Sequence, residues 1–235
     1  IQADNRGNGN ATIDLSGNVT GVIGRGNLSF YGVIAHSGDG GGAGDAAVIF
    51  RAGTIDVSGN RPRGIVVWAG GGGSGSVTTE RGTTITINGS DPGDTTATLP
   101  VKAAIAVQLD SATAEAGRSA TANVASTIVN TGPATADASI FNTPVGIRVM
   151  TYANAPVSVT YTGEGITTNG GGAAGIHALS GSGSVTVNAP GAINTSNGSN
   201  AVGILADSGS LLARNAGSIA DTTSEPPGRA PAATA

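Results

Sequence analysis

The sequence predicts an all-β fold: a right-handed parallel β-helix, or solenoid, with three strands per rung and about six to seven rungs. A motif of the type Gly-Ile-x-Ala recurs along the chain at spacings of 28 to 42 residues. Apolar and polar residues alternate within each copy, which is the period of a β-strand, and Gly-rich turns separate the copies. The copies open at Gly32, Gly64, Ala104, Gly146, Gly175 and Gly203.

The recurring motif forms the first strand of each repeat, and its alternation predicts two ladders of inward side chains. A slip of one residue would turn the whole apolar set outward, so this register is strongly determined. The first ladder is Val33, Ile65, Ile105, Ile147, Ile176 and Ile204, and the second is Ala35, Val67, Val107, Val149, Ala178 and Ala206.

Two further strands complete each repeat. Glycines just before the third strand predict corners with positive φ, namely Gly53, Gly82, Gly191 and Gly217. The second strand is expected at residues 75–78, 156–159, 183–187 and 209–212. The third strand is expected at residues 13–17, 55–59, 85–89, 166–170 and 193–196.

The repeats predict one continuous domain over residues 1–223. Two rungs carry loop insertions, near residues 89–103 and 131–144. The composition of the last twelve residues, 224–235, which are rich in Pro and Ala, predicts a flexible linker or tail.

Composition excludes several classes of partner. A net charge of −4 with 11% charged residues argues against nucleic acid, which needs a basic face. No apolar run reaches the length of a membrane-spanning helix, and the absence of Cys excludes disulfides. No signal peptide begins at Ile1, so the chain is expected to be a processed piece.

The outward side chains of the first strand are the candidate contact surface. Arg148, His177 and Asp207 lie on three successive rungs, where they form either an anion- or sugar-binding cluster or an ordinary solvated face. Trp68, Met150 and Leu179 form an apolar stripe where polar residues are expected. Such a stripe indicates either contact with a partner or a covering loop, for which the insertion with Ile140 and Phe141 is a candidate.

No catalytic, cofactor-binding or metal-binding residue is predicted. Polysaccharide-cleaving β-helices need paired carboxylates on one face, and no second carboxylate accompanies Asp207 there. Residues 41–45 approach a calcium-binding repeat, but the Asp comes one residue early and no second copy follows.

Repeats of the form Gly-Ile-x-Ala-x-Ser-Gly, Gly-x-Val-x-Val and Gly-x-Ile-x-Thr/Ser-Asn-Gly resemble those of bacterial autotransporter passenger domains. The resemblance covers about residues 12–223 and is clearest from Gly146 onward. It implies a fragment of a virulence-related adhesin that is exported to the bacterial surface, outside the outer membrane. Two-partner secretion or another surface fibre is the alternative.

The predicted function is therefore that of a non-enzymatic secreted or cell-surface β-helix, serving as an adhesin or stalk scaffold that can self-associate. Its expected partners are a host or neighbouring cell surface, matrix, carbohydrate or another copy of itself. The alternatives are a carbohydrate-active β-helix enzyme, either a polysaccharide lyase or a hydrolase, and a subunit of an extracellular filament.

Overall fold

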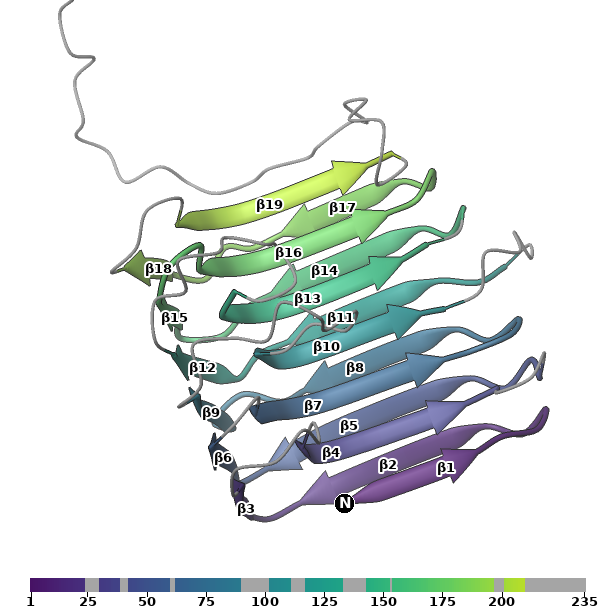
Figure 1. Ribbon diagram of the computed structural model, residues 1–235, viewed down its shortest axis with the longest axis horizontal. Coiled ribbons are helices and arrows are strands. Elements are labelled where there is room, and N and C mark those ends of the chain that lie inside the picture. The colour runs from purple at the N-terminus through teal and green to yellow at the C-terminus, as the bar shows by residue number, and fades with distance from the viewer. Residues whose placement is uncertain are drawn as a thin grey trace, which may run out of the picture.

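The chain folds as a parallel β-solenoid of about six to seven rungs, in which three parallel sheets stack their strands in order (Figure 1). The computed structural model describes residues 1–23, 30–38, 42–59, 62–89, 102–110, 117–132, 143–152, 154–196 and 201–209. All regular structure in these ranges is β-strand. The prediction of an all-β parallel β-helix is confirmed.

Each complete rung contributes one strand to each of the three sheets, which we call A, B and C, and the last described rung adds a strand to sheet A alone. Sheet A contains β1 (Gln2–Asn5), β4 (Phe30–Ser37), β7 (Pro62–Ala69), β10 (Ala103–Leu109), β13 (Val145–Thr151), β16 (Ala174–Ser180) and β19 (Val202–Ser208). Sheet B contains β2 (Ala11–Ser16), β5 (Ala46–Ala52), β8 (Gly75–Thr79), β11 (Ala120–Val124), β14 (Val157–Tyr161) and β17 (Val185–Asn188). Sheet C contains β3 (Val19–Ile23), β6 (Thr54–Gly59), β9 (Thr84–Gly89), β12 (Thr127–Thr131), β15 (Ile166–Asn169) and β18 (Ile193–Ser196).

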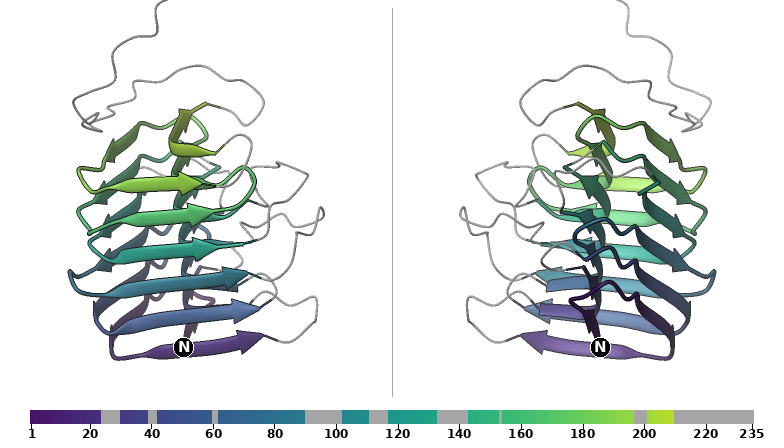
Figure 2. Two further views of the ribbon diagram at one scale, coloured as in Figure 1. Left: turned by 90° about the vertical axis from the view of Figure 1, so that its left-hand side faces the viewer. Right: turned by 90° about the vertical axis from the view of Figure 1, so that its right-hand side faces the viewer.

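The core lies inside the three sheets and is built from the ladders that the sequence predicts. Ile147 of β13 lies opposite Ile105 on one side and Ile176 on the other. The ladder residues from β4 to β16 are fully buried, whereas Ile204 and Ala206 of β19 are partly buried. Figure 2 shows the rungs stacked one above the other from two sides.

The first rung differs from the prediction. Residues 13–17 are expected in the third strand, but Ile13 belongs to β2 of sheet B and lies opposite Val48. The third strand of that rung is β3, in which Val19 faces Ile55. The error has a physical cause: β1 lacks the Gly-Ile motif, so the sequence gives no reference point for counting strands in this rung.

The glycine corners are confirmed in part. Gly53 and Gly82 have φ values of 105° and 83°, in the region that favours glycine. The φ angle of Gly191 lies outside that region. Glycine is required there for space, because a Cβ would stand 2.5 Å from Cε1 of Tyr161. Gly217 lies outside the described residues.

The corner between sheets A and B is stabilised by side chains that accept hydrogen bonds from the next rung. Asn10 Oδ1 accepts from the backbone N–H of Asp45 at 2.9 Å, and Asp45 Oδ1 accepts from that of Ser74 at 2.8 Å. Ser74 Oγ in turn accepts from the backbone N–H of Ser119 at 3.1 Å. This series adds side-chain hydrogen bonds to the backbone bonds that join successive rungs at this corner, such as the bond from Ala46 N–H to Ser74 O.

Several predictions fall outside the described residues. These are most of both insertions, including Ile140 and Phe141, most of the expected strand at 209–212, and the tail at 224–235. The extent of the domain, 1–223, stays a prediction.

Candidate functional site

The outer face of sheet A differs from the outer faces of the other two sheets. In sheets B and C buried and accessible residues alternate along the strands, as expected where one face meets water. In sheet A every residue of β10, β13 and β16 is buried, so this sheet is covered on both faces in these rungs.

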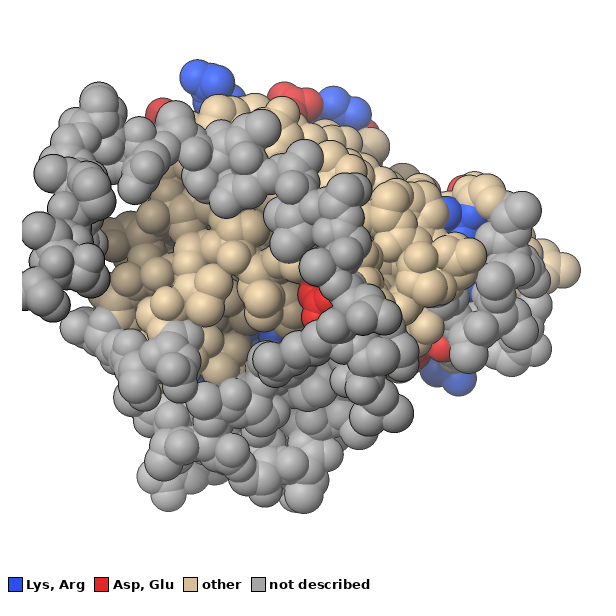
Figure 3. Space-filling model, turned by 90° about the horizontal axis from the view of Figure 1, so that it is seen from above, with Lys and Arg blue, Asp and Glu red and all other residues tan. Residues whose placement is uncertain are grey.

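From β8 to β17 the outer face of sheet B carries small uncharged side chains, whereas Asp14 and the partly exposed Ile49 lie on the outer face of β2 and β5. Small uncharged side chains are common on the solvated side of a sheet and offer no large apolar group to a partner. In sheet B the outer rows from β8 to β17 are Ser76, Thr121, Ser158 and Thr186, and Thr78, Asn123, Thr160 and Asn188. Seen along the stack, Lys, Arg, Asp and Glu occupy a small part of the described surface (Figure 3).

The outer face of sheet A instead gathers the large and chemically distinctive side chains. The only Trp, the only Met and both His of the chain lie there. One row is Gln2, Ile34, Val66, Ala106, Arg148, His177 and Leu205. The second row is Asp4, His36, Trp68, Gln108, Met150, Leu179 and Asp207.

At the N-terminal end of the second row, Asp4, His36 and Trp68 form a connected stack. His36 Nδ1 lies 3.3 Å from Asp4 Oδ1, and Arg6 Nε lies 3.3 Å from the other carboxylate oxygen. The rings of His36 and Trp68 stack with centroids 4.8 Å apart. This distance matches the spacing of rungs, so the rings stack along the solenoid.

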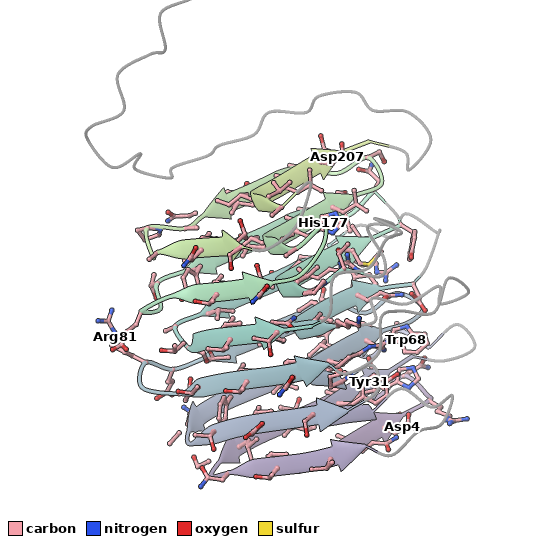
Figure 4. All side chains as sticks on the ribbon, turned by 60° about the vertical axis from the view of Figure 1, so that its left-hand side comes forward. Asp4, Tyr31, Trp68, Arg81, His177 and Asp207 are labelled. Carbon is pink, nitrogen blue, oxygen red and sulfur yellow. The ribbon has the colours of Figure 1, made fainter. Side chains whose placement is uncertain are left out.

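Tyr31 and Arg63 lie on the same two strands, β4 and β7, five residues before His36 and Trp68. Arg63 Nη1 donates a hydrogen bond of 3.1 Å to the Tyr31 hydroxyl, and its guanidinium carbon lies 5.1 Å from the centre of the Tyr31 ring. Tyr31 and Ile34 also pack against a small apolar cluster of Val66, Ala103 and Ala106, separate from the main core. In Figure 4 Asp4, Tyr31, Trp68 and His177 lie on one side of the solenoid and Arg81 on the opposite side.

Farther along the face, Arg148 and His177 form a buried pair on adjacent rungs. Arg148 Nε donates a hydrogen bond of 3.2 Å to His177 Nδ1, and the residues are 1% and 4% exposed. Burial lowers the pKa of Arg148 to about 9. Burial and, secondarily, the charge of Arg148 lower the pKa of His177 to about 3. The imidazole is therefore neutral, as its role as acceptor requires.

The structure brings only part of the predicted cluster together. Arg148 and His177 lie opposite one another, but Asp207 lies opposite Leu179, in the other row. The solvated-face interpretation is wrong for Arg148 and His177, because both are buried.

The predicted apolar stripe is buried along most of its length. Met150 and Leu179 are 2% and 5% exposed, whereas Trp68 keeps partial exposure. The choice between a covering loop and a partner stays open, since most of the insertion at 131–144 lies outside the described residues.

Sequence reasoning missed Asp4, Tyr31 and Arg63. A signal was present for two of them: Tyr31 and Arg63 occupy the same position, just before the Gly that opens each motif, and they lie opposite one another. Asp4 carried no signal because β1 was not recognised as a strand.

Within the described ranges no three His, Asp or Glu side chains come close enough to hold a metal ion. Those ranges also contain no helix of the length and apolarity needed to cross a membrane. Comparison of the chain with protein-family models, curated proteins and solved structures gave no significant match.

Proposed function

We propose that this chain is a non-enzymatic, secreted or cell-surface β-solenoid that serves as a scaffold for adhesion. It contacts a host or neighbouring cell surface, matrix or carbohydrate through the N-terminal part of the outer face of sheet A. We call this part the contact strip and define it as Asp4, Tyr31, Ile34, His36 and Trp68. The observation that carries the proposal is the partial exposure of these large side chains.

The chemistry of the contact strip suits recognition. Trp and Tyr are enriched where proteins meet partners, because they bury much area at little entropic cost. The side chains stand on paired strands and are held by one another through the contacts of Asp4 with His36 and of His36 with Trp68. A surface that is rigid before binding loses less entropy on binding.

The rest of the solenoid supports a scaffold role. Its repeated rungs form a stiff body, and the outer rows of sheet B from β8 to β17, which are uncharged, provide a hydrated surface. Transport outside the outer membrane, as the repeat style implies, belongs to the same proposal.

Self-association also belongs to the proposal, because apolar residues at the N-terminal end of the solenoid are left accessible. Ala3, Leu15 and Val19 of the first rung are only partly buried, and Val22 of β3 is 80% exposed. Sedimentation velocity over a range of concentrations tests that part.

Replacing Trp68 with Ala is expected to weaken binding to cell, matrix or glycan surfaces by roughly 30-fold, the effect of losing a 2 kcal/mol hot spot. Binding of the labelled chain to glycan arrays and matrix-coated plates measures it. Asn123→Ala, an exposed change on sheet B, is the matched control and should bind like the unmodified chain.

Equal loss of binding in both variants would contradict a contact strip on sheet A, provided that circular dichroism shows both to be folded. Turnover of an acidic polysaccharide in the same assays would instead place the chain among carbohydrate-active β-helix enzymes.

A further inference from the structure

The outer face of sheet B from β8 to β17 carries a regular array of small polar side chains. One row is Ser76, Thr121, Ser158 and Thr186, and the other is Thr78, Asn123, Thr160 and Asn188. All of these side chains are accessible to solvent. Their four strands are consecutive neighbours in the sheet (Figure 1). A hydroxyl or amide group therefore recurs at every position of both rows.

The array has two repeats, and the geometry of a parallel sheet sets both of them. Neighbouring strands lie about 4.8 Å apart, and residues that face the same side of one strand lie about 6.6 Å apart. Thr121 and Ser158 are related by the first repeat, and Thr121 and Asn123 by the second. The strands pair residue by residue from β8 to β17, so both repeats are kept along the array.

These repeats are close to those of hexagonal ice. Water molecules joined tetrahedrally by hydrogen bonds of about 2.75 Å form a lattice that repeats at about 4.5 Å in one plane and about 7.3 Å along the perpendicular axis. The sheet differs from this lattice by about 0.3 Å per strand, which adds up to about 0.9 Å over the array. Rotation about χ1 moves a side-chain oxygen by more than that difference. Both rows can therefore meet water positions of one ice surface.

The chemistry of the two rows also suits a crystal of water. Ser, Thr and Asn both donate and accept hydrogen bonds, as each water molecule in ice does. A charged side chain would have to lose part of its hydration shell, which is costly, and neither row contains one. On the inner side of the same strands Val77, Val159 and Val187 are buried in the core. The array is thus held rigidly before binding, which lowers the entropy lost on binding.

We propose that the outer face of sheet B from β8 to β17 binds ice. Its hydroxyl and amide groups, together with the waters that they hold, join the lattice at the surface of an ice crystal and stop growth of the crystal there. The contact strip on sheet A takes no part in this binding, so the proposal is independent of the proposed adhesive function.

The first two strands of sheet B limit the ice-binding face. Asp14 of β2 and Ile49 of β5 occupy the second row there, and the register between these strands shifts after Leu15. Arg51 forms ion pairs with Asp14 and Glu80 at 2.8 and 2.9 Å. Large and charged side chains therefore interrupt the array before β8.

A lysine in the middle of the face tests the proposal. Thr121 lies between Ser76 and Ser158, and Thr121→Lys places a long charged side chain among them. We expect the unmodified chain to lower the freezing point of water below its melting point and to enter growing ice when it carries a fluorescent label. Thr121→Lys should lose both activities. Nanolitre osmometry and the fluorescence of the ice measure them.

The matched control is the same substitution on the outer face of sheet C. Thr86 of β9 is partly exposed and lies between Asp56 and Val129, a charged and an apolar residue, so no uniform polar row passes through it. Thr86→Lys should keep both activities. Circular dichroism shows whether each variant is folded. If Thr121→Lys is not, Thr160→Lys makes the same test in the other row.

The proposal is overturned if the folded, unmodified chain leaves the freezing point unchanged and stays out of the ice. It is also overturned if Thr121→Lys and Thr86→Lys, both folded, keep or lose activity equally. Binding to chitin or cellulose particles that Thr121→Lys abolishes, without binding to ice, would assign the face to a crystalline polysaccharide and would overturn the proposal as well.

Discussion

Replacing Ile147 with Ala is expected to lower the free energy of unfolding by about 2–5 kcal/mol, since it removes buried methyl groups and leaves a cavity. Ile147 is fully buried in the middle of the ladder, between Ile105 and Ile176. Both ends of the solenoid are distant from Ile147, so the surrounding residues cannot move in to fill the cavity. Urea denaturation followed by circular dichroism measures the loss.

The matched control is the same change on an outer face. Ile49 of β5 lies in the outer row of sheet B, between Asp14 and Thr78, and is partly exposed. Ile49→Ala should change stability by no more than about 0.5 kcal/mol. A loss at Ile49 as large as that at Ile147 would mean that the assignment of inward and outward positions is incorrect.

Replacing Gly175 with Ala is expected to destabilise the chain by about 3 kcal/mol or to prevent folding, through overpacking. A Cβ at Gly175 would stand 2.7 Å from the backbone oxygen of Gly203 and would overlap the Ile193 side chain. The groups that must move are the side chain of Ile193, which packs against the core from β18, and the backbone of Gly203 in β19, so relief is costly. The urea midpoint and the yield of soluble protein measure the effect.

Gly165 provides the control for this substitution. It has open space around a built Cβ, and its backbone lies outside the left-handed region. Gly165→Ala should be neutral or slightly stabilising, because it reduces the freedom of the unfolded chain. Equal destabilisation at both positions would argue against close packing of rungs at Gly175.

Most of sheet A could be predicted from the sequence because its alternation and its opening Gly or Ala recur in six rungs. The inward positions of Ile65, Ile147 and Ile176 follow from this period alone. Strands β5, β11 and β12 were not predicted. In β11 the inward residues Ala120 and Ala122 are too small to mark an apolar period, and β12 buries Asn130 at the position that Ile87 occupies in β9.

The buried Asn130 shows why such a position escapes sequence reasoning. Its side-chain nitrogen donates to the backbone oxygens of Lys102 and Val145, at 2.6 and 2.8 Å. An amide is stable inside the core only when distant backbone supplies its partners. Nothing within β12 indicates that these partners exist.

The position of the candidate site could be predicted from the sequence, but the burial of its side chains could not. Alternation places Arg148 and His177 on the outer face, and equal spacing from the opening Gly places them opposite one another. Their burial depends on parts of the chain distant in sequence, so a solvated face was an equally natural expectation. The contact strip was missed in part because Asp4 belongs to a strand without the repeat motif.

The outer face of sheet A differs from the outer face of sheet B: it is buried in its middle and accessible at the N-terminal contact strip. Because the chain has no Cys, single cysteines at Met150, Ile34 and Thr186 can each be labelled with a thiol reagent at neutral pH. We expect fast labelling at Thr186→Cys, intermediate labelling at Ile34→Cys, and strong protection at Met150→Cys. Labelling of Met150→Cys as fast as Thr186→Cys, in a folded chain, would contradict the burial of this face.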